Sequence, residues 1–152
     1  MIQLFRKILC PIDFSEHSLA ALEVALKVVQ QNDAKLYLLN VAPTPAGSAG
    51  FQPIPMDPYP QLEKDGQQRL AKIGREKIPA AVRYETLVLS GDPAEQVLDT
   101  ARNIGADLIV MGTHGRTGLV HLVLGSVAER VVREAPIPVL TAHARGRARK
   151  AA

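Results

Sequence analysis

Five short segments of the chain are rich in apolar residues and have the length of β-strands. They are residues 5–12, 36–41, 82–90, 107–111 and 138–141. The second and fourth segments are apolar almost without interruption, which is typical of strands covered by helices on both faces. The third segment alternates at Tyr84, Thr86 and Val88, and this alternation predicts an edge strand with one face open to water.

Between these segments, apolar residues recur at helical spacing in four places. The predicted helices are residues 16–32, residues 61–77, a helix beginning at Pro93, and residues 126–134. Ser15 and Asp92 stand where N-caps are expected. Pro93 takes the first helical position, where its missing N–H is harmless.

The second helix has the weakest apolar face, made by Leu62, Leu70 and Ile73. The segment before it, residues 43–60, carries six prolines among Gly and Ser. Such a composition cannot sustain a helix or a central strand, so a loop is predicted there.

Strands and helices alternate along the whole chain, which predicts right-handed crossovers and a parallel sheet with helices on both faces. The fold class is therefore α/β, a single-domain, three-layer sandwich of Rossmann-like type. A length of 152 residues, 47% of them apolar, suffices for one compact domain and is too short for two. We expect this domain to span residues 1–142.

The formal net charge is +3, and much of the positive excess lies in Arg145, Arg147, Arg149 and Lys150. Four charges interleaved with Gly and Ala are a weak signal for a nucleic acid or membrane partner. We interpret residues 143–152 as a flexible, solvated basic tail, and expect neither partner.

The single cysteine, Cys10, lies in an apolar strand segment and is predicted to be a small core residue, because it cannot form an internal disulfide. The first residues contain charges and no apolar stretch long enough for a signal peptide. No window approaches the length of a membrane span. The expected location is the cytoplasm.

The segment most suggestive of chemistry runs from Met111 to Ala128 and places glycines at positions 112, 115, 118 and 125. More than ten residues separate the strand from the next helix, and connections of that length in compact domains are usually functional. Positive φ angles and close approach of a ligand are expected at Gly112 and Gly115. Gly125 and Ser126 are expected to begin a helix whose free N–H groups favour phosphate. The spacing fits neither a Walker A loop nor the dinucleotide fingerprint, and glycines that merely serve turns and caps are the alternative interpretation.

This segment reads Gly-x2-Gly-x9-Gly-Ser, and in that motif the sequence resembles the nucleotide-binding branch of the universal stress protein family. The resemblance extends over nearly the whole chain. It includes Pro-Ile-Asp at residues 11–13, Gly-Asp-Pro at residues 91–93 and Ile-Pro-Val-Leu at residues 137–140.

The resemblance implies a sheet order of 3-2-1-4-5, with a ligand site where the first and fourth strands end side by side. The residues that it places around an adenine nucleotide are Pro11, Ile12, Asp13, Val41, Met111, Gly112, Gly115, Gly125, Ser126 and Val127. Pro11, Ile12 and Asp13 would flank the adenosine, and the backbone of Val41 would meet the adenine. The other six residues would line the ribose and phosphates. One departure is Ala128, which offers no hydroxyl to a phosphate where some nucleotide-binding members have one.

The implied ligand is ATP, with AMP or cyclic AMP as alternatives, and Mg²⁺ would be held by the phosphates. The resemblance further implies a stress-response protein that acts as a ligand-dependent regulatory or protective module. It also implies a homodimer that pairs through the last strand, residues 138–141.

Two other functions remain open, a slow ATPase or autophosphorylating enzyme and a nucleotide-free interaction protein. No catalytic residue is assigned, because His114 has no nucleophile with a positioned partner that the sequence identifies. Arg116 is equally compatible with a phosphate contact and with solvent. The histidines are not spaced with other ligands as in a zinc site, so no metal site is predicted.

Overall fold

The computed structural model describes residues 3–43, 59–115 and 124–144. Strands and helices alternate strictly along these residues, as the hydrophobic pattern predicts. The elements are β1 (Lys7–Pro11), α1 (Glu16–Asn32), β2 (Lys35–Pro43), α2 (Tyr59–Lys77), β3 (Tyr84–Gly91), α3 (Pro93–Ile104), β4 (Leu108–Gly112), α4 (Ser126–Glu134) and β5 (Val139–Ala142).

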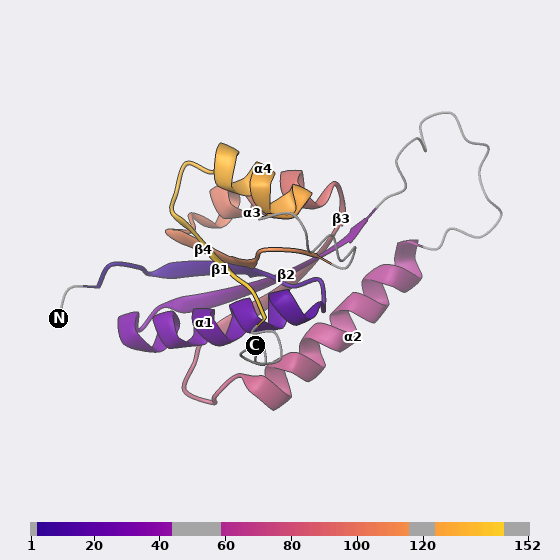
Figure 1. The fold of residues 1–152 in the computed structure, drawn as a ribbon. Coiled ribbons are helices and arrows are strands. Elements are labelled where there is room, and N and C mark those ends of the chain that lie inside the picture. The colour runs from indigo at the N-terminus through magenta and orange to yellow at the C-terminus, as the bar shows by residue number, and fades with distance from the viewer. Residues whose placement is uncertain (1–2, 44–58, 116–123, 145–152) are drawn as a thin grey trace, which may run out of the picture.

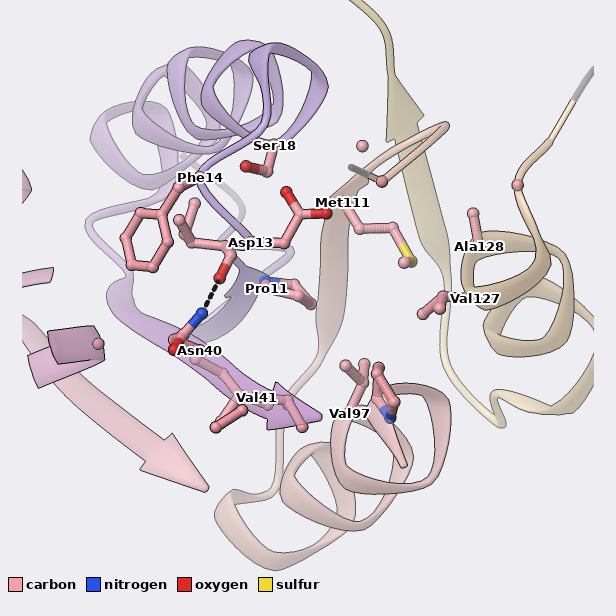
Figure 2. A pocket seen from close by; sticks show the side chains of 18 of the residues that line it. Pro11, Asp13, Phe14, Ser18, Asn40, Val41, Val97, Met111, Val127 and Ala128 are labelled. Carbon is pink, nitrogen blue, oxygen red and sulfur yellow. Dashed lines mark hydrogen bonds between the residues drawn. The ribbon is translucent and has the colours of Figure 1, made fainter. Parts of the chain in front are cut away.

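The five strands form one parallel sheet in the order β3-β2-β1-β4-β5. Helices α1 and α2 cover one face of the sheet, and α3 and α4 cover the other (Figure 1). The predicted α/β class, the helices on both faces and the strand order are confirmed, and β3 is the edge strand that its alternation indicates. Because the chain leaves β1 toward β2 and later returns to β4 on the other side, the order reverses between β1 and β4. Figure 2 shows this end of the sheet from close by.

Element ends differ from the predictions by one or two residues at most positions, and the difference is informative at two of them. Helix α2 begins at Tyr59 rather than at residue 61, because Pro60 lies in the first turn, where a missing N–H costs nothing. Strand β2 continues to Pro43, because it still pairs with β3 beyond the point where β1 ends. Residues 44–58, most of the predicted proline-rich loop, lie outside the described residues.

The predicted N-caps of α1 and α3 are confirmed. The hydroxyl of Ser15 accepts a hydrogen bond from the N–H of Ser18 at 3.2 Å. The carboxylate of Asp92 accepts one from the N–H of Glu95 at 2.9 Å. Each cap supplies a partner to an N–H that the helix itself leaves without one.

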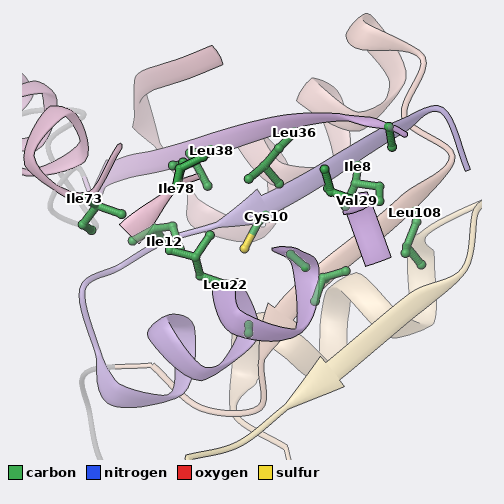
Figure 3. Packing of buried hydrophobic residues seen from close by; sticks show 14 of the residues in the cluster. Ile8, Cys10, Ile12, Leu22, Val29, Leu36, Leu38, Ile73, Ile78 and Leu108 are labelled. Carbon is green, nitrogen blue, oxygen red and sulfur yellow. The ribbon is translucent and has the colours of Figure 1, made fainter. Parts of the chain in front are cut away.

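The two faces of the sheet bury separate apolar clusters, because successive side chains of a strand point to opposite faces. In β1, Ile8 and Cys10 pack under α1 while Leu9 packs under α3 and α4. Figure 3 shows the first cluster, with Cys10 between the sheet and α1. Cys10 is fully buried, as predicted, and burial raises the pKa of its thiol to about 12.

None of the helices in the described part of the chain is long and apolar enough to cross a membrane. Residues 145–152, which make up most of the predicted basic tail, lie outside the described residues.

The burial of Cys10 predicts that its thiol is inert in the native protein. At pH 9 an unfolded thiol is about half ionised, whereas the native thiol stays protonated and is shielded from reagents. Ellman's reagent at pH 9 should therefore label the chain in urea and leave the native protein unlabelled over the same time. Equal labelling rates in both conditions would contradict the burial.

The same pKa shift has a consequence for stability. The pKa of the Cys10 thiol is higher in the folded state than in the unfolded state. Its contribution to the free energy of unfolding is therefore complete below about pH 9 and decreases as the pH rises toward 12.

Candidate functional site

A pocket of about 310 Å³ opens where the strand order reverses, at the carboxyl ends of β1 and β4. Open α/β sheets bind ligands at this position, because the loops leaving the two neighbouring strands turn to opposite faces. The walls come from the ends of β1, β2 and β4, one side of α2, and the first turns of α3 and α4.

All ten residues predicted as the ligand site line this pocket. They are Pro11, Ile12, Asp13, Val41, Met111, Gly112, Gly115, Gly125, Ser126 and Val127. Figure 2 shows Pro11 and Asp13 between Val41 on one side and Met111 on the other, with Val127 facing them from α4. The structure thus brings together residues from four separate stretches of the chain, and their contact with a ligand stays a prediction.

The carboxylate of Asp13 has one structural contact and one oxygen beside the glycine segment. Its Oδ1 accepts a hydrogen bond from the N–H of Ser15 at 2.9 Å. A Cβ built on Gly115 would lie 2.8 Å from its Oδ2. Asp13 therefore orders the turn into α1 without being the N-cap, which is Ser15, and it keeps an acceptor on the pocket side (Figure 2).

The expectation of positive φ angles at Gly112 and Gly115 is wrong. The glycines with positive φ among the described residues are Gly91 and Gly105. Gly112 is required for a different reason, because a Cβ there would lie 2.8 Å from the backbone carbon of His17 in α1. The absence of a side chain at Gly112 lets the end of β4 pack directly on the backbone of α1.

The first turn of α4 points into the pocket and has no side-chain cap within the described residues. Its N-cap is Gly125, whose own N–H donates to the carbonyl of Thr113 at 2.7 Å. Intrahelical bonding begins at Glu129, whose N–H donates to Gly125. The N–H groups of Ser126, Val127 and Ala128 thus precede the hydrogen-bonded ladder, and the helix dipole adds positive potential to them. Such a helix start favours an anion.

Sequence reasoning missed the contribution of α2 to the pocket. Four of its residues line the wall, namely Leu62, Asp65, Gly66 and Arg69. Their spacing of three, four and seven positions is one face of a helix and was the available signal. The spacing of apolar residues along the chain hides this role, because Leu62 shares a helical pattern with Leu70 and Ile73, and only the last two are buried in the core.

Two further missed residues shape the pocket beside α2. Asn40 is only 8% exposed and donates from its Nδ2 to the carbonyl of Ile12 at 2.8 Å. This bond fixes the ends of β1 and β2 relative to each other (Figure 2). Phe14 has a φ of +67°, which is rare for a bulky residue, and its ring forms part of the wall.

The histidines near the pocket are engaged with one another and with the chain after β5. The rings of His17 and His114 lie 5.4 Å apart, and His114 Nδ1 is 3.1 Å from the hydroxyl of Thr113. The N–H of Ala144 donates to His17 Nδ1 at 3.0 Å. Arg116 lies outside the described residues. Within the described ranges, no three His, Cys, Asp or Glu side chains gather to hold a metal.

Fold and pocket together define a three-layer α/β protein with a ligand site at the reversal of strand order. The chain belongs to the universal stress protein family, whose family model matches residues 4–143. It is 37% identical over 142 residues to a universal stress protein of Methanocaldococcus jannaschii, with 90% of this chain and 81% of that protein covered. A universal stress protein of Thermus aquaticus is 36% identical over 140 residues, with 90% and 98% covered.

Solved structures agree with the family and the fold. Hypothetical protein MJ0577 of M. jannaschii superposes with a TM-score of 0.80 at 26% identity, covering 95% of this chain and 99% of that one. A universal stress protein in complex with cAMP has a TM-score of 0.61 at 24% identity, with 93% and 98% covered. One from Archaeoglobus fulgidus in complex with dAMP has a TM-score of 0.63 at 20% identity, with 91% and 98% covered. The last two likenesses concern the fold alone.

The close contact at Gly112 predicts a specific pattern of stability changes. Gly112→Ala should lower the free energy of unfolding by about 2 kcal/mol, because the added Cβ meets backbone atoms that cannot rotate away. Gly125→Ala should cost less, since its nearest contacts are at 3.3 Å. Urea unfolding of the two variants measures the difference, and an equal or reversed order would contradict the close packing of β4 on α1.

Proposed function

We propose that this protein belongs to the nucleotide-binding branch of its family and binds an adenine nucleotide in the pocket between β1 and β4. ATP is the first candidate ligand, and AMP and cyclic AMP are the alternatives. In this proposal the bound nucleotide changes the conformation or partner affinity of the protein, which then acts as a regulatory or protective module in a stress response. The observation that carries the proposal is the convergence of the Gly-x2-Gly-x9-Gly-Ser segment and residues 11–13 on one pocket with an uncapped helix start.

The phosphates would lie at the first turn of α4. The charged residues among the described lining are Asp13, Asp65 and Arg69, and only the last of these is a cation. Arg69 lies on α2, on the Phe14 side of the pocket. Backbone N–H groups of residues 126–128 and the Ser126 hydroxyl would therefore be the main phosphate donors in the described lining.

The adenosine would lie between the ends of β1 and β2. Pro11, Val41 and Val97 present apolar groups to the pocket there (Figure 2). An aromatic base gains free energy by removing such surface from water. The oxygen of Asp13 on the pocket side can accept a hydrogen bond from the ribose or base.

A Mg²⁺ ion would be carried on the phosphate oxygens of the nucleotide.

The nucleotide complexes of two fold relatives support the proposal at the level of the fold. They contain cAMP and dAMP, so a protein of this fold can hold an adenine nucleotide. The assignment to this chain depends on its own pocket and motif.

We also propose a homodimer that pairs through β5. This strand ends the sheet, so one of its edges has no neighbouring strand within the described chain. Leu140 exposes 38% of its surface there, and unpaired edges are suited to association with a second copy.

The nucleotide proposal predicts that Gly115→Val abolishes binding. The new side chain would press on Asp13 Oδ2 and fill the space between residues 13 and 115. Titration calorimetry with ATP, AMP and cyclic AMP should show binding to the wild type and at least a tenfold loss in the variant. Gly105→Asn is a matched control, since Gly105 lies outside the pocket, has no atom within 4 Å of its Cβ position and has a φ that Asn tolerates.

Mass spectrometry of ligand released from the purified protein complements the titration and identifies the natural nucleotide. A wild type that binds none of the three nucleotides would refute the proposal and favour the nucleotide-free interaction protein. Release of phosphate from bound ATP, lost on Asp13→Asn, would instead establish the slow enzyme.

The dimer proposal predicts that Leu140→Asp yields monomers. A charge at position 140 opposes the pairing of two copies through β5. Light scattering coupled to size-exclusion chromatography should report a dimer for the wild type and a monomer for the variant. Val132→Asp, an exposed site on α4, serves as the comparison. A wild-type monomer would refute the dimer.

A further inference from the structure

One face of α2 forms a continuous wall of the pocket that the Gly-x2-Gly-x9-Gly-Ser motif does not include. We call Leu62, Asp65, Gly66 and Arg69 the α2 stripe. On one helix face it combines an apolar side chain, a carboxylate, a glycine without a side chain, and a guanidinium. Leu62 leaves 44% of its surface exposed although it lies on the pocket wall, so the stripe offers apolar surface to an occupant.

The position of the stripe is fixed by two contacts of α2 with the sheet. A Cβ on Gly66 would lie 2.5 Å from Asn40 Oδ1, so the backbone of α2 at this glycine packs directly on the Asn40 side chain at the end of β2. One turn earlier, the hydroxyl of Ser90 donates to Glu63 Oε1 at 2.5 Å. The stripe therefore faces the pocket as a preformed surface.

Arg69 is held in place within this surface. Its guanidinium carbon lies 3.9 Å from the centre of the Phe14 ring, which is a cation–π contact. Asp65 Oδ2 is 3.9 Å from Arg69 Nη1, close enough for attraction and too far for a hydrogen bond. The carboxylate and the guanidinium thus orient each other without forming a hydrogen bond to each other.

We propose that the α2 stripe selects the base of the nucleotide, with Arg69 as donor and Asp65 as acceptor to the base edge. This inference rests on the proposed function. Adenine presents a ring nitrogen acceptor beside an amino donor, which complements one guanidinium and one carboxylate. Leu62 supplies apolar contact to the face or rim of the base.

The stripe acts on the base and not on the phosphates because of its place in the pocket. Phe14, against which Arg69 packs, and Val127 of the α4 helix start lie on opposite sides of the pocket in Figure 2. Loss of an Arg69 contact should therefore weaken every adenine ligand by the same factor, whatever its number of phosphates. A phosphate contact would instead weaken ATP most and adenosine least.

The structural alternative is that Arg69 only shields Phe14, which also packs against the core cluster under α1. In that case Arg69→Gln lowers stability and leaves ligand affinity unchanged. Thermal unfolding of the ligand-free protein, measured beside the titrations, separates the two roles.

The first experiment titrates wild type, Arg69→Gln and Arg75→Gln with ATP, AMP and adenosine by calorimetry. Arg75 is exposed on the same helix and does not line the pocket, so it is the matched control. We expect about a tenfold loss of affinity in Arg69→Gln, equal for the three ligands, and no change in Arg75→Gln, since one hydrogen bond to a charged group has that effect. An unchanged Arg69→Gln affinity, or a loss that grows with the number of phosphates, would overturn the inference.

The second experiment compares ATP with ITP, which carries a carbonyl oxygen in place of the adenine amino group. Wild type should prefer ATP, and Asp65→Asn should reduce that preference several-fold, because an amide can donate to the carbonyl oxygen. An unchanged preference would remove Asp65 from base recognition. If wild type binds no adenine ligand at all, the proposed function itself fails. This outcome differs from one in which wild type binds and substitutions in the α2 stripe leave binding unchanged.

Discussion

The pairing of β1 with β4 in the middle of the sheet is the contact on which the remaining structure depends. Both strands are buried on both faces, and Ile8 and Leu9 pair in parallel with Leu108 and Ile109. The loop after β1 turns toward α1, while the segment after β4 leads to α4 on the other face. The opening between the two strand ends is therefore not covered by a crossover helix, and this geometry produces the pocket.

Three glycines allow close contacts that help to shape the pocket. Without a side chain, Gly112 lets the end of β4 pack on α1, Gly115 accommodates Asp13, and Gly66 lets α2 reach Asn40. At Gly125, the N–H that ties α4 to Thr113 leaves the next three amides at the helix start directed to the pocket. Preorganisation of this kind lowers the entropy lost when a ligand binds, because few groups must be ordered in the complex.

In the proposed complex, the charges and dipoles of the described lining give different tasks to different walls of the pocket. The α4 wall offers backbone dipoles, which suit any phosphate without discriminating among bases. The α2 wall carries Asp65 and Arg69, whose side chains can discriminate by hydrogen-bond pattern. Recognition of the common and of the variable part of a nucleotide would then rest on separate elements, and each could change in evolution without the other.

The sequence by itself determined the order and type of the nine elements in the described residues, the caps at Ser15 and Asp92, and the segment that carries the glycines. These features depend on local periodicity and on hydrogen bonds between residues close in the chain, so spacing reveals them. Together with the family resemblance, it also identified ten residues that the fold gathers around one pocket. Tertiary structure alone decided the role of Gly112, the turning of Leu62 away from the core, and the stacking of Arg69 on Phe14. Those contacts depend on distances between elements that meet only after folding, and no spacing along the chain encodes such distances.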